Sequence, residues 1–331
     1  MRISKETLIR IAKETVQKRV FSDPELVAAY LTGSLRTENP FLGSTADIDI
    51  VFVHASEPKA RREIVALTPE IHLDLVHNPR SEYEKPKELR VHPWLGPEIY
   101  DPLPLYATRH FFEFVQAGVR DKYHEPANVL ARARKNAEHA RQIWSDLPSS
   151  QDSGPALLLP YLKSVNHAAN AIAVLTSIPL AERRFLLQFP KLAEAAEVPG
   201  LVPEMEGLVG ANKTDGEKLG GLLLEWQKDF LDAASRPGVD ERITAPRLNY
   251  YKLAFESLLA SETPQAMIWP LVLTWTLAAA ALPAMYRSKW QAAMTMLGLT
   301  GVEFGDRIED LDHFLDSVEE LLENRADSQG L

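Results

Sequence analysis

The sequence predicts an α+β fold, in which an N-terminal mixed-sheet domain is followed by an all-α helical bundle. Short apolar runs of strand length are confined to the N-terminal third of the chain, whereas helical spacing of apolar residues dominates from about residue 107 onward. We therefore place the domains at 1–106 and 107–331. A chain of 331 residues is long enough for two domains, each with its own core.

The N-terminal domain is expected to open with a helix over 4–19, where apolar residues recur at helical spacing and Ser4 is a candidate N-cap. Apolar runs predict three strands, over 27–31, 47–54 and 70–77. Residues 57–67 fit either a helix or a strand. Six prolines between 79 and 104 predict loop with short extended pieces.

The helical domain shows a long succession of amphipathic segments. The expected helices cover 108–119, 127–145, 156–177, 181–195, 215–235, 246–261, 266–280 and 307–324. Residues 263–286 carry no charge, but they are rich in alanine and threonine and contain three prolines. This composition favours a helix buried at the centre of a bundle over a membrane span.

Composition narrows the classes of function. The net charge of −10 disfavours a broad surface for duplex nucleic acid, which needs clustered Lys and Arg. The absence of cysteine excludes disulfides, thiolate zinc sites and a cysteine nucleophile. The N-terminus has no apolar signal core, so we expect a cytoplasmic protein with no membrane partner. Both a monomer and a homodimer are compatible with the sequence.

Two carboxylates, Asp47 and Asp49, lie two residues apart in an apolar strand. Side chains alternate along a strand, so both point to one face. Such close carboxylates repel each other unless a cation lies between them. Mg²⁺ prefers oxygen ligands, and a pair of ions can hold both oxygens of an in-line displacement. Asp74, on the next expected strand, could complete the metal site or accept a proton as general base.

A Gly33-Ser34 turn precedes the paired carboxylates by about a dozen residues. Glycine lets backbone approach a phosphate closely, and successive N–H groups with a serine hydroxyl can bind an anion. Taken singly, the turn and each Asp suit ordinary structural positions. Their order and their strand contexts together indicate a site that binds metal and triphosphate.

This arrangement over residues 27–76 resembles the nucleotidyltransferase superfamily of DNA polymerase beta. The resemblance implies that Asp47 and Asp49 bind two Mg²⁺ ions and that Gly33 and Ser34 hold the β- and γ-phosphates. It further implies that Asp74 is a metal ligand or the general base. The division into a short catalytic domain and a helical domain resembles the small-molecule (aminoglycoside) adenylyltransferases.

Two cations are further candidates for nucleotide binding. Arg36 follows the Gly33-Ser34 turn and could steady phosphate charge, or it is a solvated loop arginine. Lys163 lies on an apolar helix, and the family resemblance implies a helical-domain cation against the triphosphate; otherwise Lys163 is a surface lysine with a buried stem. Asn166, His167 and Asn170 share its helix face, where they line a cleft or are hydrogen-bonded core groups.

We therefore expect an enzyme that moves a nucleoside monophosphate, AMP in the simplest case, from an NTP such as ATP to a hydroxyl of a small molecule. An aminoglycoside-like antibiotic is one such acceptor, bound in a cleft between the domains. Two alternatives stay open. One is nucleotidylation of a protein or RNA, as in antitoxin-like or regulatory relatives. The other is a non-catalytic module that binds nucleotide.

Overall fold

The computed structural model describes residues 3–331. The chain forms two compact units, Met1–Asn128 and Val129–Leu331. This division lies later in the chain than the 106/107 boundary suggested by the sequence, because helix α4 packs within the first unit. The domain limits of 1–106 and 107–331 stay a prediction.

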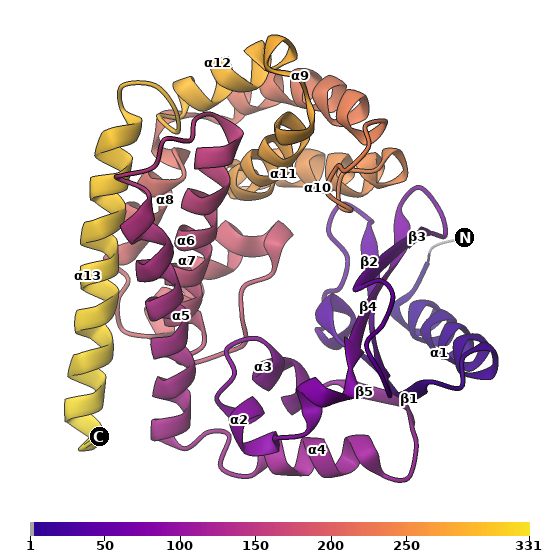
Figure 1. The fold of residues 1–331 in the computed structure, drawn as a ribbon. Coiled ribbons are helices and arrows are strands. Elements are labelled where there is room, and N and C mark those ends of the chain that lie inside the picture. Colours follow the sequence, from indigo (N-terminus) through magenta and orange to yellow (C-terminus); the bar gives the residue numbers. More distant parts are fainter. Residues whose placement is uncertain (1–2) are drawn as a thin grey trace. The chain divides into compact units, whose positions relative to one another are not determined.

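The first unit contains a five-stranded mixed sheet in the order β3-β4-β2-β1-β5 (Figure 1). The strands are β1 (Leu26–Leu31), β2 (Ala46–His54), β3 (Arg62–Ala66), β4 (Ile71–Pro79) and β5 (Leu103–Ala107). β2 and β4 run parallel, and every other neighbouring pair is antiparallel. A mixed sheet followed by helices confirms the α+β fold class, and all three predicted strands are present.

Both faces of this sheet are covered, because its strands direct apolar side chains to either side. Helix α1 (Lys5–Ser22) begins at the predicted N-cap, where the Ser4 hydroxyl accepts a hydrogen bond from the Thr7 N–H. Its buried residues pack against Ile48 and Ile50 of β2. Val51 of the same strand faces the opposite core, which includes residues of α2, α3 and α4.

The segment between residues 79 and 104 differs from the expectation of loop with extended pieces. It forms a 3-10 turn, η2 (Arg80–Tyr83), two short helices, α2 (Pro86–Arg90) and α3 (Leu95–Tyr100), and the start of β5. The prediction was wrong because proline also suits the first turn of a helix, as Pro86 does in α2. Helix α4 (Phe111–Arg120) then packs on α2 and α3.

A chain of hydrogen bonds links the sheet to α3 beneath this cover. The Tyr30 hydroxyl of β1 donates to the Glu98 carboxylate at 2.7 Å and lies 2.9 Å from the Tyr83 hydroxyl, which accepts a further bond from Asn78. Burial raises the pKa of Glu98 from its usual 4.5 to about 7. The negative form of Glu98 is therefore disfavoured in the folded protein.

The second unit is helical throughout its regular structure. Its helices are α5 (Pro126–Asp146), which begins at the end of the first unit, α6 (Pro155–Ala173), α7 (Phe185–Ala195), α8 (Leu201–Leu208), α9 (Gly216–Ala234), α10 (Leu248–Leu259), α11 (Ile268–Ala281), α12 (Ser288–Met296) and α13 (Phe304–Gln329). The eight helices expected from the sequence are all found. The short α8 and α12 were not predicted, because each is too brief to display a clear helical period.

Helix α11 is the buried centre that the uncharged stretch predicted, and it packs on α6, α7, α9 and α12. Threonine hydroxyls are polar groups that this buried helix offers to neighbouring side chains. The Thr274 hydroxyl accepts a hydrogen bond from the Trp226 indole at 3.1 Å, and the Thr276 hydroxyl accepts one from Trp290 at 3.2 Å. None of the helices within residues 3–331 combines the length and apolar composition that crossing a bilayer requires.

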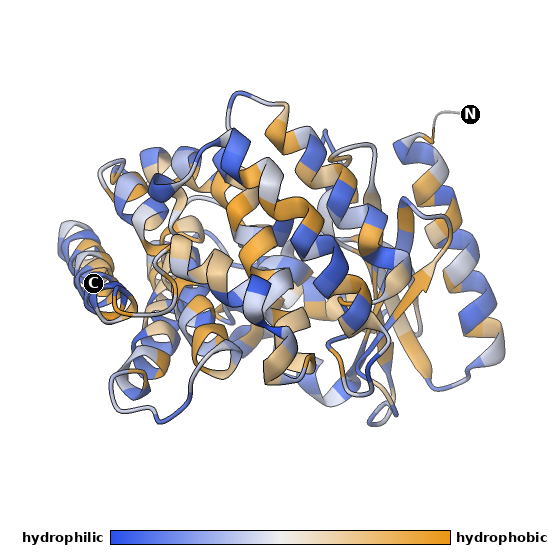
Figure 2. Ribbon diagram, turned by 90° about the horizontal axis from the view of Figure 1, so that it is seen from above, coloured by the Kyte–Doolittle hydropathy of each residue, from blue (hydrophilic) through white to orange (hydrophobic). Residues whose placement is uncertain are grey.

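The long terminal helix α13 carries hydrophobic residues among hydrophilic ones (Figure 2), and its buried residues recur at helical spacing, as expected of a helix with one buried face. Arg141 of α5 ties it down by ion pairs to three of its acids, Asp312, Asp316 and Glu319. These pairs raise the pKa of the Arg141 guanidinium, with the Glu319 hydrogen bond as the largest cause. The acidic composition of this helix is thus partly offset within the unit.

The raised pKa of Glu98 predicts that stability depends on pH. The folded protein holds a proton on Glu98 up to about pH 7, whereas the unfolded chain loses it near 4.5. The stability from this group is therefore complete below pH 4.5 and is lost as the pH rises through 7. The Glu98→Gln variant still accepts a hydrogen bond from Tyr30. As the pH rises from 4.5 to 8, we expect its free energy of unfolding to increase by about 2 to 3 kcal/mol relative to that of the wild type.

Urea unfolding across this pH range measures the effect. Glu88→Gln is the matched control, because Glu88 lies on neighbouring α2 with its side chain 71% exposed. An unchanged pH dependence in Glu98→Gln would show that the buried carboxyl does not titrate as described.

Candidate metal and nucleotide site

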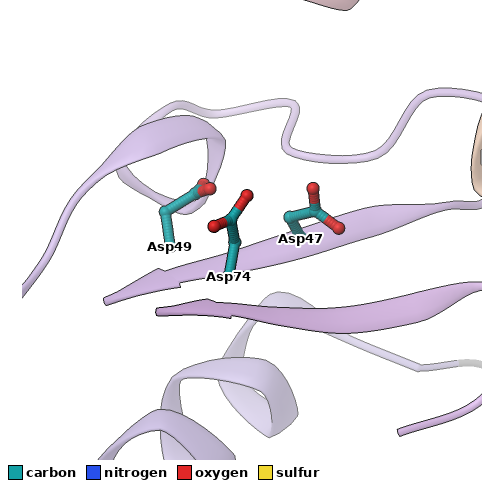
Figure 3. A group of neighbouring side chains, drawn as sticks. All are labelled: Asp47, Asp49 and Asp74. Carbon is teal, nitrogen blue, oxygen red and sulfur yellow. The ribbon is translucent and has the colours of Figure 1, made fainter. Parts of the chain in front are cut away.

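Three aspartates meet on one face of the sheet because of how β2 and β4 pair. In this parallel pair Asp49 lies directly beside Asp74, and Asp47 lies beside His72. Neighbouring residues in register point to the same face, and Asp47 shares that face by alternation. One carboxylate oxygen from each residue lies within 4.8 Å of one oxygen from each of the other two, and Figure 3 shows the three side chains together. The structure thus brings together the three carboxylates that the sequence singled out.

The donor set fits a hard divalent cation. Asp47 and Asp74 are only 5% and 4% exposed, and Asp49 is half-buried. Burying several carboxylates side by side is unfavourable unless positive charge accompanies them. Carboxylate oxygens are the ligands that Mg²⁺ and Mn²⁺ prefer. Among residues 3–331, this is the one cluster of three or more His, Cys, Asp or Glu side chains with such spacing.

Gly33 packs directly against the Asp49 carboxylate. It opens the 3-10 turn η1 (Gly33–Arg36). The Gly33 backbone has a φ of +69°, in the left-handed region, and a Cβ at this position would lie 1.9 Å from Asp49 Oδ2. Only glycine fits here, for reasons of both backbone conformation and space. The turn therefore presents exposed backbone beside the acidic cluster.

The side chains of Arg62 and His72 flank the aspartates within the first unit. Arg62 of β3 donates from Nε to Asp74 Oδ1 at 2.8 Å and from Nη2 to Asp74 Oδ2 at 2.5 Å. The Nδ1 atom of the fully buried His72 lies 3.8 Å from Asp47 Oδ1. His72 is therefore a cross-strand neighbour of Asp47. Arg62 is the partner that the sequence analysis missed.

The sequence around Arg62 did not reveal that this residue lies beside Asp74. It lies in 57–67, which fitted a helix or a strand equally well. Once this segment is known to be a strand paired with β4, Ile64 lies opposite Asp74, and Arg62 is two residues away on the same face. Knowledge of strand pairing, and not of residue type, was the missing information.

The other proposed nucleotide-binding cations lie in well-defined surroundings. Arg36 donates to the Asp101 backbone carbonyl and carboxylate, both at 3.2 Å, so this arginine is not a free loop residue. Lys163 is exposed on α6 of the second unit. The involvement of Arg36, Lys163, Gly33 and Ser34 in nucleotide binding stays a prediction.

Two of the polar residues near Lys163, Asn170 and His167, are buried. Asn170 is fully buried, and its side chain accepts from the Leu180 N–H at 2.7 Å, so this residue is a satisfied core group. His167 is 7% exposed, and its pKa falls to about 4, mainly through burial and also through the charges of His139 and Lys163. His167 is thus neutral at physiological pH.

Comparisons with known proteins give little further information. No protein-family model matches this chain, and no curated protein matches it. Among solved structures, it is similar to a nucleotidyltransferase-like protein from Exiguobacterium sibiricum, with 10% identity, a TM-score of 0.30, and coverage of 94% of this chain and 91% of that one. At this TM-score the similarity carries no argument about function.

The close approach of Gly33 to Asp49 predicts a defect in metal binding. In Gly33→Ala the new methyl group must displace the Asp49 carboxylate, and the left-handed backbone adds about 1 kcal/mol of strain. We expect Mn²⁺ binding, followed by electron paramagnetic resonance, to weaken on the order of tenfold or more. The fold should persist, with a modest fall in melting temperature.

Gly238→Ala is the matched control for backbone strain. Gly238 has a φ of +72°, and a Cβ there would meet nothing within 4 Å. This variant should lose similar stability and bind Mn²⁺ normally. If Gly33→Ala also binds Mn²⁺ normally, Asp49 is not a ligand of the ion.

Proposed function

We propose that this protein is a metal-dependent nucleotidyltransferase. The observation that carries the proposal is a set of three aspartates on neighbouring parallel strands, which bring one carboxylate oxygen each to within 4.8 Å of one another, with a glycine turn packed on one of them. A solvated acidic patch would not require this packing. The nearly complete burial of Asp47 and Asp74 likewise favours a site built for a cation.

In this proposal Asp47 and Asp49, with Asp74, hold divalent ions, which supply charge stabilisation to the phosphates of a bound NTP. The turn at Gly33 and Ser34 offers N–H and hydroxyl donors to the β- and γ-phosphates. The acceptor hydroxyl oxygen forms a bond to the α-phosphorus, the bond from that phosphorus to the bridging oxygen breaks, and pyrophosphate leaves. The hydroxyl proton passes to Asp74 or to solvent.

We further propose that the acceptor is a hydroxyl of a small molecule and that AMP is the group transferred. The net charge of −10 favours a cationic acceptor over an anionic one, and aminoglycoside-like antibiotics belong to that class. Transfer to a protein or RNA is the alternative. The small-molecule acceptor is preferred because the acidic chain would repel a polyanionic RNA.

Pyrophosphate release tests this function. The protein would be incubated with Mg²⁺, each of the four NTPs and a panel of hydroxylated small molecules that includes aminoglycosides. We expect release that depends on one acceptor class and falls a hundredfold or more, roughly, in Asp47→Asn and Asp49→Asn. Glu57→Gln is the control, since Glu57 is an exposed acid that pairs only with nearby Arg61 among the described residues.

The outcomes separate the alternatives. Release with no small molecule, but with a protein or RNA present, would move the acceptor to a macromolecule. Measurable NTP binding without release for any acceptor would indicate a nucleotide-binding module. Equal activity in Asp47→Asn and wild type would contradict the proposed site.

Asp74→Asn separates the two roles open to Asp74. The substitution removes the negative charge and the basic oxygen while keeping the shape, so turnover should be lost in either role. If Asp74 is the general base, the variant should retain binding of nucleotide with metal, measured by calorimetry. If Asp74 is a metal ligand, this binding should weaken together with turnover.

A further inference from the structure

The geometry around Arg62 follows from strand pairing. β3 and β4 are antiparallel, with Ile64 opposite Asp74 and Arg62 opposite Val76. Arg62 is therefore a diagonal neighbour of Asp74 on the same face, within reach of a long side chain. The guanidinium meets the carboxylate side-on, with Nε on one oxygen and Nη2 on the other. Such a two-point contact fixes both the position and the rotation of the carboxylate.

β3 is itself held from its other face, and this support keeps Arg62 in place. Glu63, the next residue, points away from the aspartates and accepts two hydrogen bonds from Arg19 of α1, at 2.7 and 2.9 Å. His77 of β4 lies 3.9 Å from the same carboxylate. β3 therefore has one charged contact on each face of the sheet.

We propose that Arg62 is a positioning residue for Asp74 and a resident counter-charge that competes with divalent ions at the acidic cluster. This inference rests on the proposed function. A guanidinium stays charged at every accessible pH, so Arg62 supplies a permanent positive charge beside three carboxylates. It steadies Asp74 when no ion is bound, and it repels an ion that approaches the Asp74 oxygens.

An ion that approaches Asp74 must compete with Arg62, because both Asp74 oxygens accept hydrogen bonds from this guanidinium. Asp74 should join an ion only when the charge of an added ion or nucleotide complex outweighs that of Arg62. The alternative is that Arg62 merely ties β3 to β4, in which case its removal would change stability and not ion affinity.

Mn²⁺ binding to the full chain without nucleotide, followed by electron paramagnetic resonance, distinguishes these cases. A doubly charged ion about 5 Å from a guanidinium is repelled appreciably even in a water-like medium. In Arg62→Gln we expect Mn²⁺ to bind on the order of tenfold more tightly than in wild type. The matched control is Arg61→Gln, which removes the same charge from a surface residue that pairs with Glu57 and Glu82; its affinity should stay close to that of wild type.

Thermal unfolding supplies a second readout. Without Mn²⁺, Arg62→Gln should melt below wild type, because three neighbouring carboxylates lose their counter-charge. Saturating Mn²⁺ should stabilise this variant more than it stabilises wild type, since binding to the folded state raises stability with affinity. A merely structural tie would lower the melting temperature equally with and without Mn²⁺.

Arg62→Lys keeps the test decisive if Arg62→Gln does not fold. It retains the charge but loses the side-on pair of donors. We expect its Mn²⁺ affinity to stay within about twofold of wild type, whereas kcat for pyrophosphate release falls and the KM for nucleotide does not. Retention of full kcat in Arg62→Lys would overturn the positioning role.

The failure of this inference can be told apart from failure of the proposed function. If Asp47→Asn abolishes Mn²⁺ binding but Arg62→Gln leaves it unchanged or weakens it, the site exists and the competition by Arg62 is refuted. If Mn²⁺ binding is the same in wild type and Asp47→Asn, the metal site itself is refuted.

Discussion

The register between β2 and β4 is the constraint on which the site depends. Parallel pairing sets Asp49 beside Asp74, and strand alternation adds Asp47 to the same face. A slip of one residue would turn Asp74 to the α1 side of the sheet, and it would also move His72 and Leu73 to the opposite faces. The register is held by apolar residues on both faces of β2, which pack under α1 on one side and under α2, α3 and α4 on the other. The free energy gained by burying this core thus offsets the repulsion between the neighbouring carboxylates.

Negative charge is tolerated in this cluster because of what surrounds it. Arg62 offsets Asp74 directly, and the small Gly33 leaves room for the Asp49 carboxylate where any larger residue would displace it. Glu98 of the same unit is stabilised differently. It accepts a hydrogen bond from Tyr30, and burial raises its pKa to about 7, which favours the neutral form. Acidic groups in one small unit are therefore accommodated in different ways, by a counter-charge at Asp74 and by a raised pKa at Glu98.

The sequence was sufficient for features set by local spacing and insufficient for those set by strand partners. Alternation placed Asp47 and Asp49 on one face, and the Gly33 turn was expected from residue type, so the core of the candidate site was predictable. Arg62 and Glu98 were not, because their partners lie in strands and helices distant in sequence. The short helices between residues 79 and 104 were missed for a related reason. Pro86 begins α2, and both α2 and α3 are stabilised by packing on α4 and not by their own length.

β3 is an edge strand, and edge strands offer open backbone to any chain that can add to the sheet. This one is five residues long and carries opposite charges in succession, with Arg62 directed to one face and Glu63 to the other. An incoming strand would have to accommodate both charges and the ion pairs that hold them. The same two residues that anchor the edge to the aspartates and to α1 thereby make this edge a poor template for an added strand.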